Sequence, residues 1–256
     1  MADSAETSAD AREIDWPEAV ARHRKVWDAK PALRRIYTGW FRWLRRRCLP
    51  GSTLEVGGGS GRLKAFWPAV VSSDVIDVPW LDVVADVHAL PFEAGSFDNV
   101  VGVDVLHHLA DVDVALGEIA RVLRCGGRAV FVEPYISPLS HWVRRRFHHE
   151  DIRLDRESLF STEKRPEEAN LAIPTLLFDR HRRDFGRRFP GLRVLGVELS
   201  DPLAYPLTGG YSHPSLLPQG LLTALWSVEP ALGSLSRWLA FKMRIVLEAT
   251  GAKPAS

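Results

Sequence analysis

The sequence predicts an α/β fold in which a doubly wound, mainly parallel sheet carries helices on both faces. Between residues 53 and 133, short apolar runs of strand length alternate with segments of helical periodicity, which is typical of βαβ units. The first of these runs enters a glycine-rich turn, Glu55-Val-Gly-Gly-Gly-Ser-Gly61, and a short helix is expected after it. A chain of 256 residues fits one elaborated domain.

The chain begins with a helical region and continues as alternating strands and helices. Residues 14–48 are expected to be helical with a break near Pro31, because Ile36, Trp40 and Leu44 recur at helical spacing. Strands are expected at 53–56, 70–73, 83–85, 97–103 and 128–133. Helices are expected at 62–67 and 113–123, and Cys125-Gly-Gly127 is expected to end the second one.

The C-terminal part of the chain is less regular. Residues 134–190 hold basic and aromatic clusters without a clean period. Residues 192–199 and 243–249 have strand character, and an apolar helix is expected at 221–240 between them.

Composition narrows the classes of protein that the chain can belong to. The net charge of +1 gives no electrostatic argument for a nucleic-acid partner. The sequence contains no run of 18 apolar residues, so no membrane-spanning helix is expected. Cys48 and Cys125 are too few for a disulfide framework, so we expect reduced cysteines and a cytoplasmic protein.

The glycine-rich turn indicates a close approach of backbone to a ligand. Glycine permits positive φ and removes side chains that would block that approach. The last position of a dinucleotide fingerprint would fall on Arg62 instead of glycine, and no phosphate-loop Gly-Lys-Ser/Thr is present. A plain strand–turn–helix with glycines for packing remains the alternative.

Two acidic residues at strand ends fit a nucleoside ligand. Asp74 follows the second expected strand, 17 residues after Gly57, near the offset at which an acid meets a ribose in nucleotide-binding folds. Asp86 ends the third strand, where a carboxylate beside a backbone amide can read an adenine edge. The alternatives are a solvated strand-end aspartate for Asp74 and a helix N-cap for Asp86.

Four ordered motifs carry a family resemblance. They are Ala85-Asp-Val-His-Ala-Leu-Pro-Phe92, Gly95-Ser-Phe-Asp98, Val105-Leu-His-His-Leu109 and Glu118-Ile-Ala-Arg-Val-Leu-Arg-Cys-Gly-Gly127. Together they resemble the class I S-adenosylmethionine (SAM)-dependent methyltransferases of the methyltransferase type 11 group. The resemblance implies a Rossmann-like sheet of seven strands, with 192–199 and 243–249 as the last two and the seventh antiparallel.

The resemblance also implies roles for individual residues. Glu55 would orient the glycine loop and the amino group of the cofactor, and Asp104 would lie near its methionine end. The remaining cofactor contacts would come from Gly57, Gly59 and Gly61 for methionine and ribose, Asp74 for ribose, and Asp86 with Val87 for adenine. His107 and His108 would lie at the mouth of the transfer site.

Two departures from the family pattern affect these assignments. Asp74 and Asp86 are only 12 residues apart, so the helix between their strands must be shortened or missing, and Asp77 is the alternative ribose ligand. The usual Pro-Gly-Gly before the fifth strand is Cys125-Gly-Gly127, which still provides a glycine to end the helix.

One domain is expected from 14 to 256, behind a terminus at 1–13 whose composition, rich in Ala, Ser, Asp and Glu, predicts disorder. Within it, 14–50 is a helical lead-in, 51–134 the cofactor-binding half, 135–190 a cap insertion and 191–250 the last strands with a lid helix. Tyr205 to Pro214 is expected to form the lid segment, with a tight structural loop as the alternative.

The chemistry left to the protein is placement of the acceptor and, for a hydroxyl or a protonated amine, removal of a proton. His108 is the favoured base because it follows the fourth strand's carboxyl end, where ligands of open α/β sheets bind. His107 is the second choice. The other candidates are Glu133, His148, His149, Tyr205 and His213. No metal is predicted, because the adjacent His148 and His149 would point to different sides of a helix.

The favoured function is therefore an enzyme that transfers a methyl group from SAM to a small-molecule acceptor. The alternative is a catalytically silent SAM-binding partner subunit or regulatory protein. Arg62 and the Asp86 motif disfavour an NAD-dependent oxidoreductase. Peripheral membrane contact through 221–240 and the arginine-rich Arg42 to Arg47 would make an apolar or lipid-linked acceptor more plausible. The other interpretation of these two segments is packing on the sheet.

Overall fold

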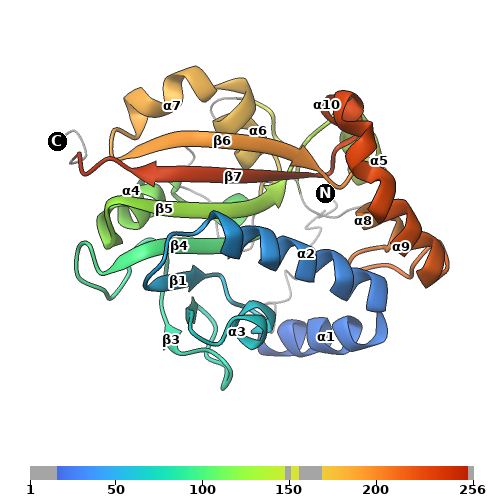
Figure 1. Ribbon diagram of the computed structural model, residues 1–256, viewed down its shortest axis with the longest axis horizontal. Coiled ribbons are helices and arrows are strands. Elements are labelled where there is room, and N and C mark those ends of the chain that lie inside the picture. The colour runs from blue at the N-terminus through green and yellow to red at the C-terminus, as the bar shows by residue number, and fades with distance from the viewer. Residues whose placement is uncertain (1–15, 148–150, 156–168, 253–256) are drawn as a thin grey trace, which may run out of the picture.

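The computed structural model describes residues 16–147, 151–155 and 169–252. The expected disorder at 1–13 and the base candidates His148 and His149 lie outside these residues. Seven strands form one sheet in the order β3-β2-β1-β4-β5-β7-β6 (Figure 1). They are β1 (Thr53–Val56), β2 (Val71–Asp74), β3 (Val83–Val84), β4 (Phe97–Val103), β5 (Leu123–Pro134), β6 (Leu192–Ser200) and β7 (Lys242–Ala249).

The strand directions confirm the predicted fold class. β1 pairs in parallel with β2 and β4, and β4 pairs in parallel with β5. β7 is antiparallel to both of its neighbours, β5 and β6. The parallel strands therefore end at one edge of the sheet, which is where a ligand site is expected in such a fold.

Helices cover both faces of the sheet, because alternate residues of the strands point to opposite sides. One core joins Val100 and Phe131 to α4 (Val112–Val122) and α7 (Arg182–Arg188). The other core joins Val101 and Val130 to α2 (Pro31–Arg47). The helices are α1 (Trp16–Ala29), α2 (Pro31–Arg47), α3 (Arg62–Phe66), η1 (Leu106–His108), α4 (Val112–Val122), α5 (Pro138–Phe147), α6 (Ile173–Thr175), η3 (Leu176–Arg180), α7 (Arg182–Arg188), α8 (Ala204–Leu207), α9 (Gln219–Val228), η4 (Glu229–Leu235) and α10 (Ser236–Leu239). Among the described residues, no helix combines the length and the hydropathy needed to cross a membrane.

The prediction that Cys125-Gly-Gly127 ends a helix is wrong. α4 already stops at Val122, and Leu123 has extended backbone (φ −76°, ψ 140°) that begins β5. The register against β4 jumps from Leu123 to Arg128, so the glycines lie in an irregular loop inside the strand. A Cβ on Gly127 would lie 2.8 Å from the carbonyl oxygen of Arg124, and this close backbone approach requires glycine there.

The prediction of a single helix at 221–240 is also wrong, whereas the prediction that the helix after β2 is shortened or missing is confirmed. The chain forms α9, a 3-10 segment and the short α10, because Pro230 cannot donate the hydrogen bond that would continue α9. Residues 75–82 connect β2 to β3 without a helix, as the spacing of Asp74 and Asp86 predicts.

Candidate active site

A cavity of about 1350 Å³ lies along the carboxyl ends of the parallel strands. Its walls reach from the loop after β1 to Lys242 at the start of β7. Two parts differ in construction. We name them after the roles that the family resemblance implies: the donor half comprises the ends of β1, β2 and β3, and the acceptor half comprises the ends of β4, β5 and β7 with α5 and α8.

The glycine loop shapes the donor half through its backbone. Gly57, Gly59 and Gly61 all have positive φ (67°, 42° and 67°). A Cβ on Gly57 would collide with Val105 Cγ2, so this position must be glycine. At Gly59, a Cβ would meet no atom closer than 3.9 Å, so the absent side chain leaves open space on the cavity wall.

Asp74 is joined directly to this loop. Its Oδ2 accepts a hydrogen bond from the Gly59 amide at 2.8 Å, and its side chain lines the cavity. The alternative ribose ligand, Asp77, is not among the lining residues. The Trp80 indole donates to the Gly59 carbonyl at 2.8 Å and closes the loop from the β2–β3 connection.

Glu55 is a buried acid beneath the glycine loop. Only 5% of the residue is exposed, and the Ser72 hydroxyl donates a hydrogen bond to its Oε2. Burial disfavours the charged form and raises the pKa of Glu55 to about 7, although the Ser72 hydrogen bond opposes this shift. Glu55 therefore exchanges a proton near neutral pH.

Asp86 and Val87 line the outer end of the donor half. The backbone amide of His88 donates to Asp86 Oδ1 at 2.9 Å, and the His88 ring lies 2.6 Å from the same oxygen. Burial alone would raise the pKa of Asp86, but the two His88 contacts outweigh it, so this pKa is lowered.

Two motif residues hold the turn that follows. Glu118 accepts a hydrogen bond from the Leu90 amide at 2.9 Å, and Arg121 donates to the carbonyls of Leu90 and Phe92. Glu118 and Arg121 also pair with each other. These contacts join α4 to the turn that follows Asp86.

The acceptor half contains a buried ion pair at its floor. Asp104 follows β4 with a positive φ of 58°, and its carboxylate accepts from Lys242 Nζ and, at 3.3 Å, from the Tyr37 hydroxyl. Burial would raise the pKa of Asp104, but the nearby ammonium lowers it overall. The ammonium also lies 5.0 Å from the ring centroids of Trp40 and Tyr205.

Lys242 and Tyr37 were not predicted as site residues. Lys242 is 138 positions from Asp104 and Tyr37 is 67 positions from it, so no local motif joins them. The signal that could have found Lys242 is the predicted antiparallel strand at 243–249, because the residue just before it then lies at the carboxyl end of the parallel strands. Tyr205, by contrast, was a sequence candidate, and it lines the cavity here.

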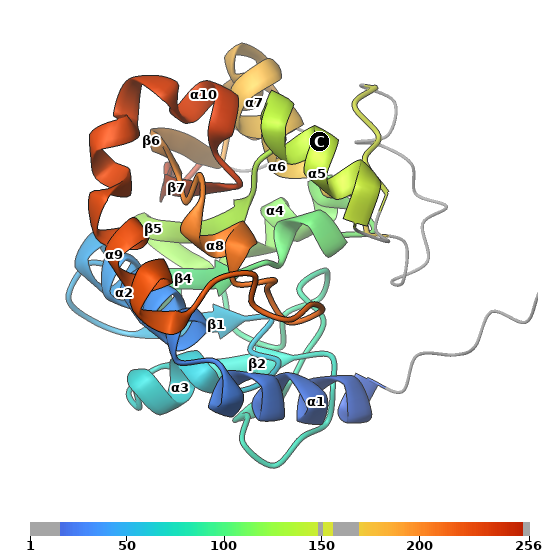
Figure 2. The same cartoon turned by 90° about the vertical axis from the view of Figure 1, so that its right-hand side faces the viewer.

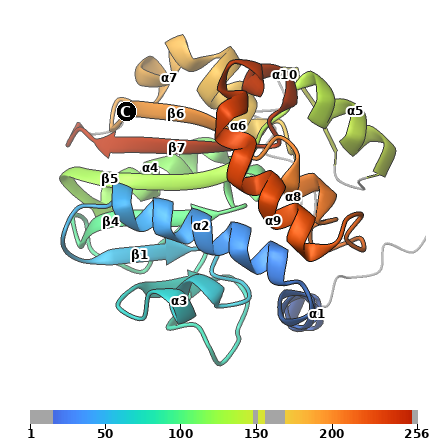
Figure 3. The ribbon, with the colours of Figure 1, turned by 45° about the vertical axis from the view of Figure 1, so that its right-hand side comes forward.

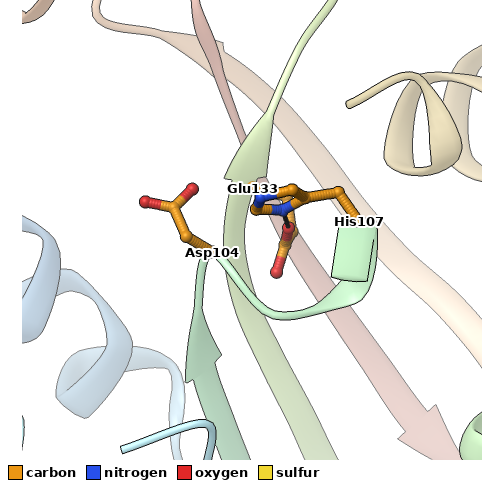
Figure 4. A group of neighbouring side chains, drawn as sticks. All are labelled: Asp104, His107 and Glu133. Atoms are coloured by element: carbon orange, nitrogen blue, oxygen red, sulfur yellow. Dashed lines mark hydrogen bonds and ion pairs between the residues drawn. The ribbon is translucent and has the colours of Figure 1, made fainter. Parts of the chain in front are cut away.

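Glu133 and His107 form a second buried pair beside the first (Figure 4). Glu133 Oε1 accepts hydrogen bonds from the amides of Val105 and Leu106 at 2.8 and 2.9 Å. Its Oε2 lies 3.0 Å from His107 Nδ1. Burial and the charge of Asp104 raise the pKa of Glu133 to about 8, so the pair holds an additional proton below that pH.

Ligand atoms of Asp104, His107 and Glu133 lie within 4.8 Å of one another, a spacing that a metal ion can use. These atoms already have partners. Glu133 accepts two backbone amides, and Asp104 accepts the Lys242 ammonium. Figure 4 also shows the Asp104 carboxylate turned away from the imidazole. We therefore treat the group as two hydrogen-bonded pairs.

The remaining sequence candidates also reach the cavity. His108 is half-buried, lines the wall, and lies with its ring centroid 4.1 Å from that of His107. The predicted lid segment contains α8 and a tight turn whose carbonyls, at Thr208 and Gly210, accept hydrogen bonds from Lys30. His213 bonds to the Phe147 carbonyl at 3.0 Å and joins this segment to α5.

Known proteins match parts of this chain. Residues 54–131 match the methyltransferase domain of the type 11 group. An uncharacterised 37.1 kDa protein in transposon TN4556 of Streptomyces fradiae is 51% identical over 51 residues, which is 20% of this chain and 15% of that protein.

Two solved structures share the fold along most of the chain. A SAM-dependent methyltransferase from Thermotoga maritima has a TM-score of 0.53 and 15% identity, and the match covers 92% of this chain and 98% of that one. A chain from a Haloferax volcanii complex with the Trm112 methyltransferase activator has a TM-score of 0.51 and 17% identity, with 94% and 99% covered. Residues 54–131 therefore match a methyltransferase domain, and the chain shares its fold with these two structures.

Proposed function

We propose that the protein transfers a methyl group from SAM to a small-molecule acceptor, because residues 54–131 match a methyltransferase domain. The observation that carries the proposal is the continuous cavity, which joins the glycine loop to the His107–Glu133 pair. The donor half would hold SAM, and the acceptor half would hold the acceptor.

The residues of the donor half fit SAM. The positive φ values of the glycine loop leave an open cradle for the methionine and ribose parts, and Asp74 offers carboxylate oxygens for ribose hydroxyls. Asp86 and Val87 would hold the adenine at the outer end. Glu55, beneath the loop, and Asp104, at the boundary of the halves, are the acids that would face the amino acid part.

The acceptor half would position the acceptor and remove its proton. Bound SAM supplies an electrophilic methyl group on a sulfonium sulfur. Glu133 holds His107 through Nδ1 and so fixes Nε2 as the ring nitrogen that can take a proton from the acceptor. This arrangement favours His107 over His108 as the base, and His108 would support its ring from the side.

The walls of the acceptor half favour an apolar acceptor. Leu139, Trp142, Phe147 and Phe241 line it, together with the aromatic ring of Tyr205. Such surfaces bind ligands mainly by burying apolar area, with few polar groups to orient them. We propose a small apolar molecule, including a lipid-linked one, as the substrate class.

Calorimetry with S-adenosylhomocysteine tests the donor half, and transfer of radiolabel from SAM to a metabolite extract tests the reaction. We expect micromolar binding of S-adenosylhomocysteine, no binding of NAD, and a labelled acceptor. Binding without any labelled acceptor would favour the silent SAM-binding protein. No binding at millimolar S-adenosylhomocysteine would exclude both functions.

The pH profile of kcat/KM tests the base. Since the pKa of Glu133 is raised to about 8, the base form of the pair accumulates as pH rises through about 8, and kcat/KM should rise with it. His107→Asn should lower kcat by about 10²- to 10⁴-fold, and Glu133→Gln should move the midpoint. His181→Asn, whose side chain lies outside the cavity lining, should change neither, and an unchanged profile in both site variants would rule out this base.

A further inference from the structure

The segment 202–236 differs from an ordinary protein surface. It contains one charged residue, Glu229, although a quarter of the whole chain is charged. Glu229 is only 6% exposed and accepts hydrogen bonds from the amides of Leu203 and Ala204. Large apolar side chains are exposed instead, including Leu216 at 71%. Exposed apolar surface of this extent marks a binding surface.

Only one side of α9 packs against the rest of the described protein. Leu222 is fully buried, and a Cβ on Gly39 of α2 would lie 2.7 Å from the Trp226 ring, so α9 packs tightly on α2. Leu221 and Val228 remain more than half exposed. The outward side of α9 is therefore apolar and without a partner in the described residues.

α5 adds two exposed apolar side chains, Trp142 and Phe147. It lies beside α10, at the end of the molecule that faces the viewer in Figure 2 and comes forward in Figure 3. We call the exposed apolar residues of this end the apolar rim: Trp142, Phe147, Leu216, Leu221, Val228 and Trp238. Trp142, Phe147 and Leu216 also line the cavity, so part of the rim belongs to the cavity wall.

The charges next to the rim are positive. Arg145 and Arg146 are exposed on α5, Arg237 is exposed on α10, and Arg35 lies 5.8 Å over the Trp226 ring. Among the described residues, Asp179 lies 3.8 Å from Arg237. Residues 134–147 and 202–236 contain no Asp or Glu other than the buried Glu229.

We propose that the apolar rim docks on the surface of an anionic lipid bilayer. Apolar and tryptophan side chains would enter the boundary between headgroups and acyl chains, while Arg35, Arg145, Arg146 and Arg237 meet the anionic headgroups. In this orientation the cavity mouth faces the bilayer. The docking surface does not depend on methyl transfer, but it gives a lipid-borne acceptor direct entry to the acceptor half.

The charge pattern favours a bilayer over a second copy of the chain. A symmetric dimer places the same patch of both protomers against itself. The exposed arginines of one protomer would then face those of the other, and residues 134–147 and 202–236 supply no exposed acid to neutralise them. An anionic bilayer neutralises all of them at once.

Vesicle sedimentation tests the proposal with the full chain. We expect binding to vesicles of phosphatidylcholine with 30 mol% (~ one lipid in three) phosphatidylglycerol and little binding to phosphatidylcholine alone. Trp142→Ser combined with Trp238→Ser should weaken binding by at least about tenfold. Arg145→Gln combined with Arg146→Gln should weaken binding by about 25-fold, since each charge near the surface contributes about fivefold.

Matched controls separate the rim from the rest of the surface. Val114→Ser removes an exposed apolar residue on α4. Arg45→Gln with Arg46→Gln removes two exposed charges near the end of α2 that leads into β1, where Arg45 lies over Trp67. Both controls should bind like the unmodified protein.

Three outcomes would overturn the proposal: no binding to anionic vesicles, equal losses in rim and control variants, or concentration-dependent dimerisation that the tryptophan substitutions abolish. S-adenosylhomocysteine affinity, measured in parallel without vesicles, should not change when Arg145→Gln and Arg146→Gln are combined, because these two residues lie outside the cavity lining. A failure of membrane docking is therefore distinguishable from a failure of the proposed methyl transfer.

Discussion

The two halves of the cavity are built in different ways. The donor half uses backbone groups and acids that lie near one another in the chain, and the Gly59–Asp74 hydrogen bond spans 15 residues. The acceptor half uses side chains brought together across the sheet, and the Asp104–Lys242 pair spans 138 residues. A short local sequence can specify the first half, whereas only the complete fold assembles the second.

The largest effect is expected from breaking the long-range pair of the acceptor half. Lys242→Met leaves Asp104 without its ammonium partner, and loss of one member of a buried pair destabilises a protein by about 3–5 kcal/mol. Asp104 retains some exposure (25% of its side chain), so we expect a loss of about 3 kcal/mol in the free energy of unfolding, measured by urea denaturation.

Two further variants isolate this pair. Lys64→Met breaks the half-exposed pair with Asp82 and should cost less than about 1 kcal/mol. Adding Asp104→Asn to Lys242→Met removes the isolated charge and should recover at least half of the loss. A double variant no more stable than Lys242→Met would show that the stability comes from packing of the lysine stem.

The next effect tests whether the donor half depends on backbone shape. Gly57→Ala forces a left-handed conformation that costs about 1–2 kcal/mol, and its Cβ collides with Val105. We expect the Kd of S-adenosylhomocysteine, measured by calorimetry, to rise by at least about 30-fold. Gly117→Ala, where a Cβ meets no atom within 4 Å, should leave the Kd unchanged. Equal affinities in both variants would contradict the backbone argument.

A smaller effect distinguishes the two ribose candidates. Asp74→Asn weakens both the Gly59 contact and the carboxylate offered to the ribose, and hydrogen bonds to a charged group contribute about 1.5–3 kcal/mol. The Kd of S-adenosylhomocysteine should rise about 10- to 100-fold. Asp77→Asn should have no effect, and the reverse ranking would assign the ribose to Asp77.

The same contrast explains what the sequence could predict. The class of fold follows from hydrophobic periodicity, and a local pattern predicts that the glycine loop and Asp86 lie at the ligand site, where both line the cavity. Lys242 and Tyr37 were missed because their roles depend on tertiary contacts. The Cys125-Gly-Gly127 error arose because glycine both ends helices and relieves crowding inside irregular strands, and local spacing does not separate these two uses.

The smallest effect concerns the protonation of the donor half. The pKa of Glu55 is raised to about 7 in the folded protein, while an unfolded glutamate loses its proton near pH 4.5. Between these values the folded state binds a proton that the unfolded state has lost. The contribution of Glu55 to the free energy of unfolding is therefore greatest at low pH and declines as pH rises through about 7.

Glu55→Gln keeps a hydrogen-bond acceptor for Ser72 and removes the titration. We expect the free energy of unfolding, measured by urea denaturation, to fall between about pH 5.5 and 7. The fall should be about 1 kcal/mol larger for the unmodified protein than for the variant. Asp82→Asn is the control, because the pKa of Asp82 is lowered and its titration falls below this window. Parallel curves for Glu55→Gln and the unmodified protein would mean that Glu55 stays ionised beneath the loop. The donor half would then contain a buried charge that depends on its neighbours as strongly as the acceptor half does.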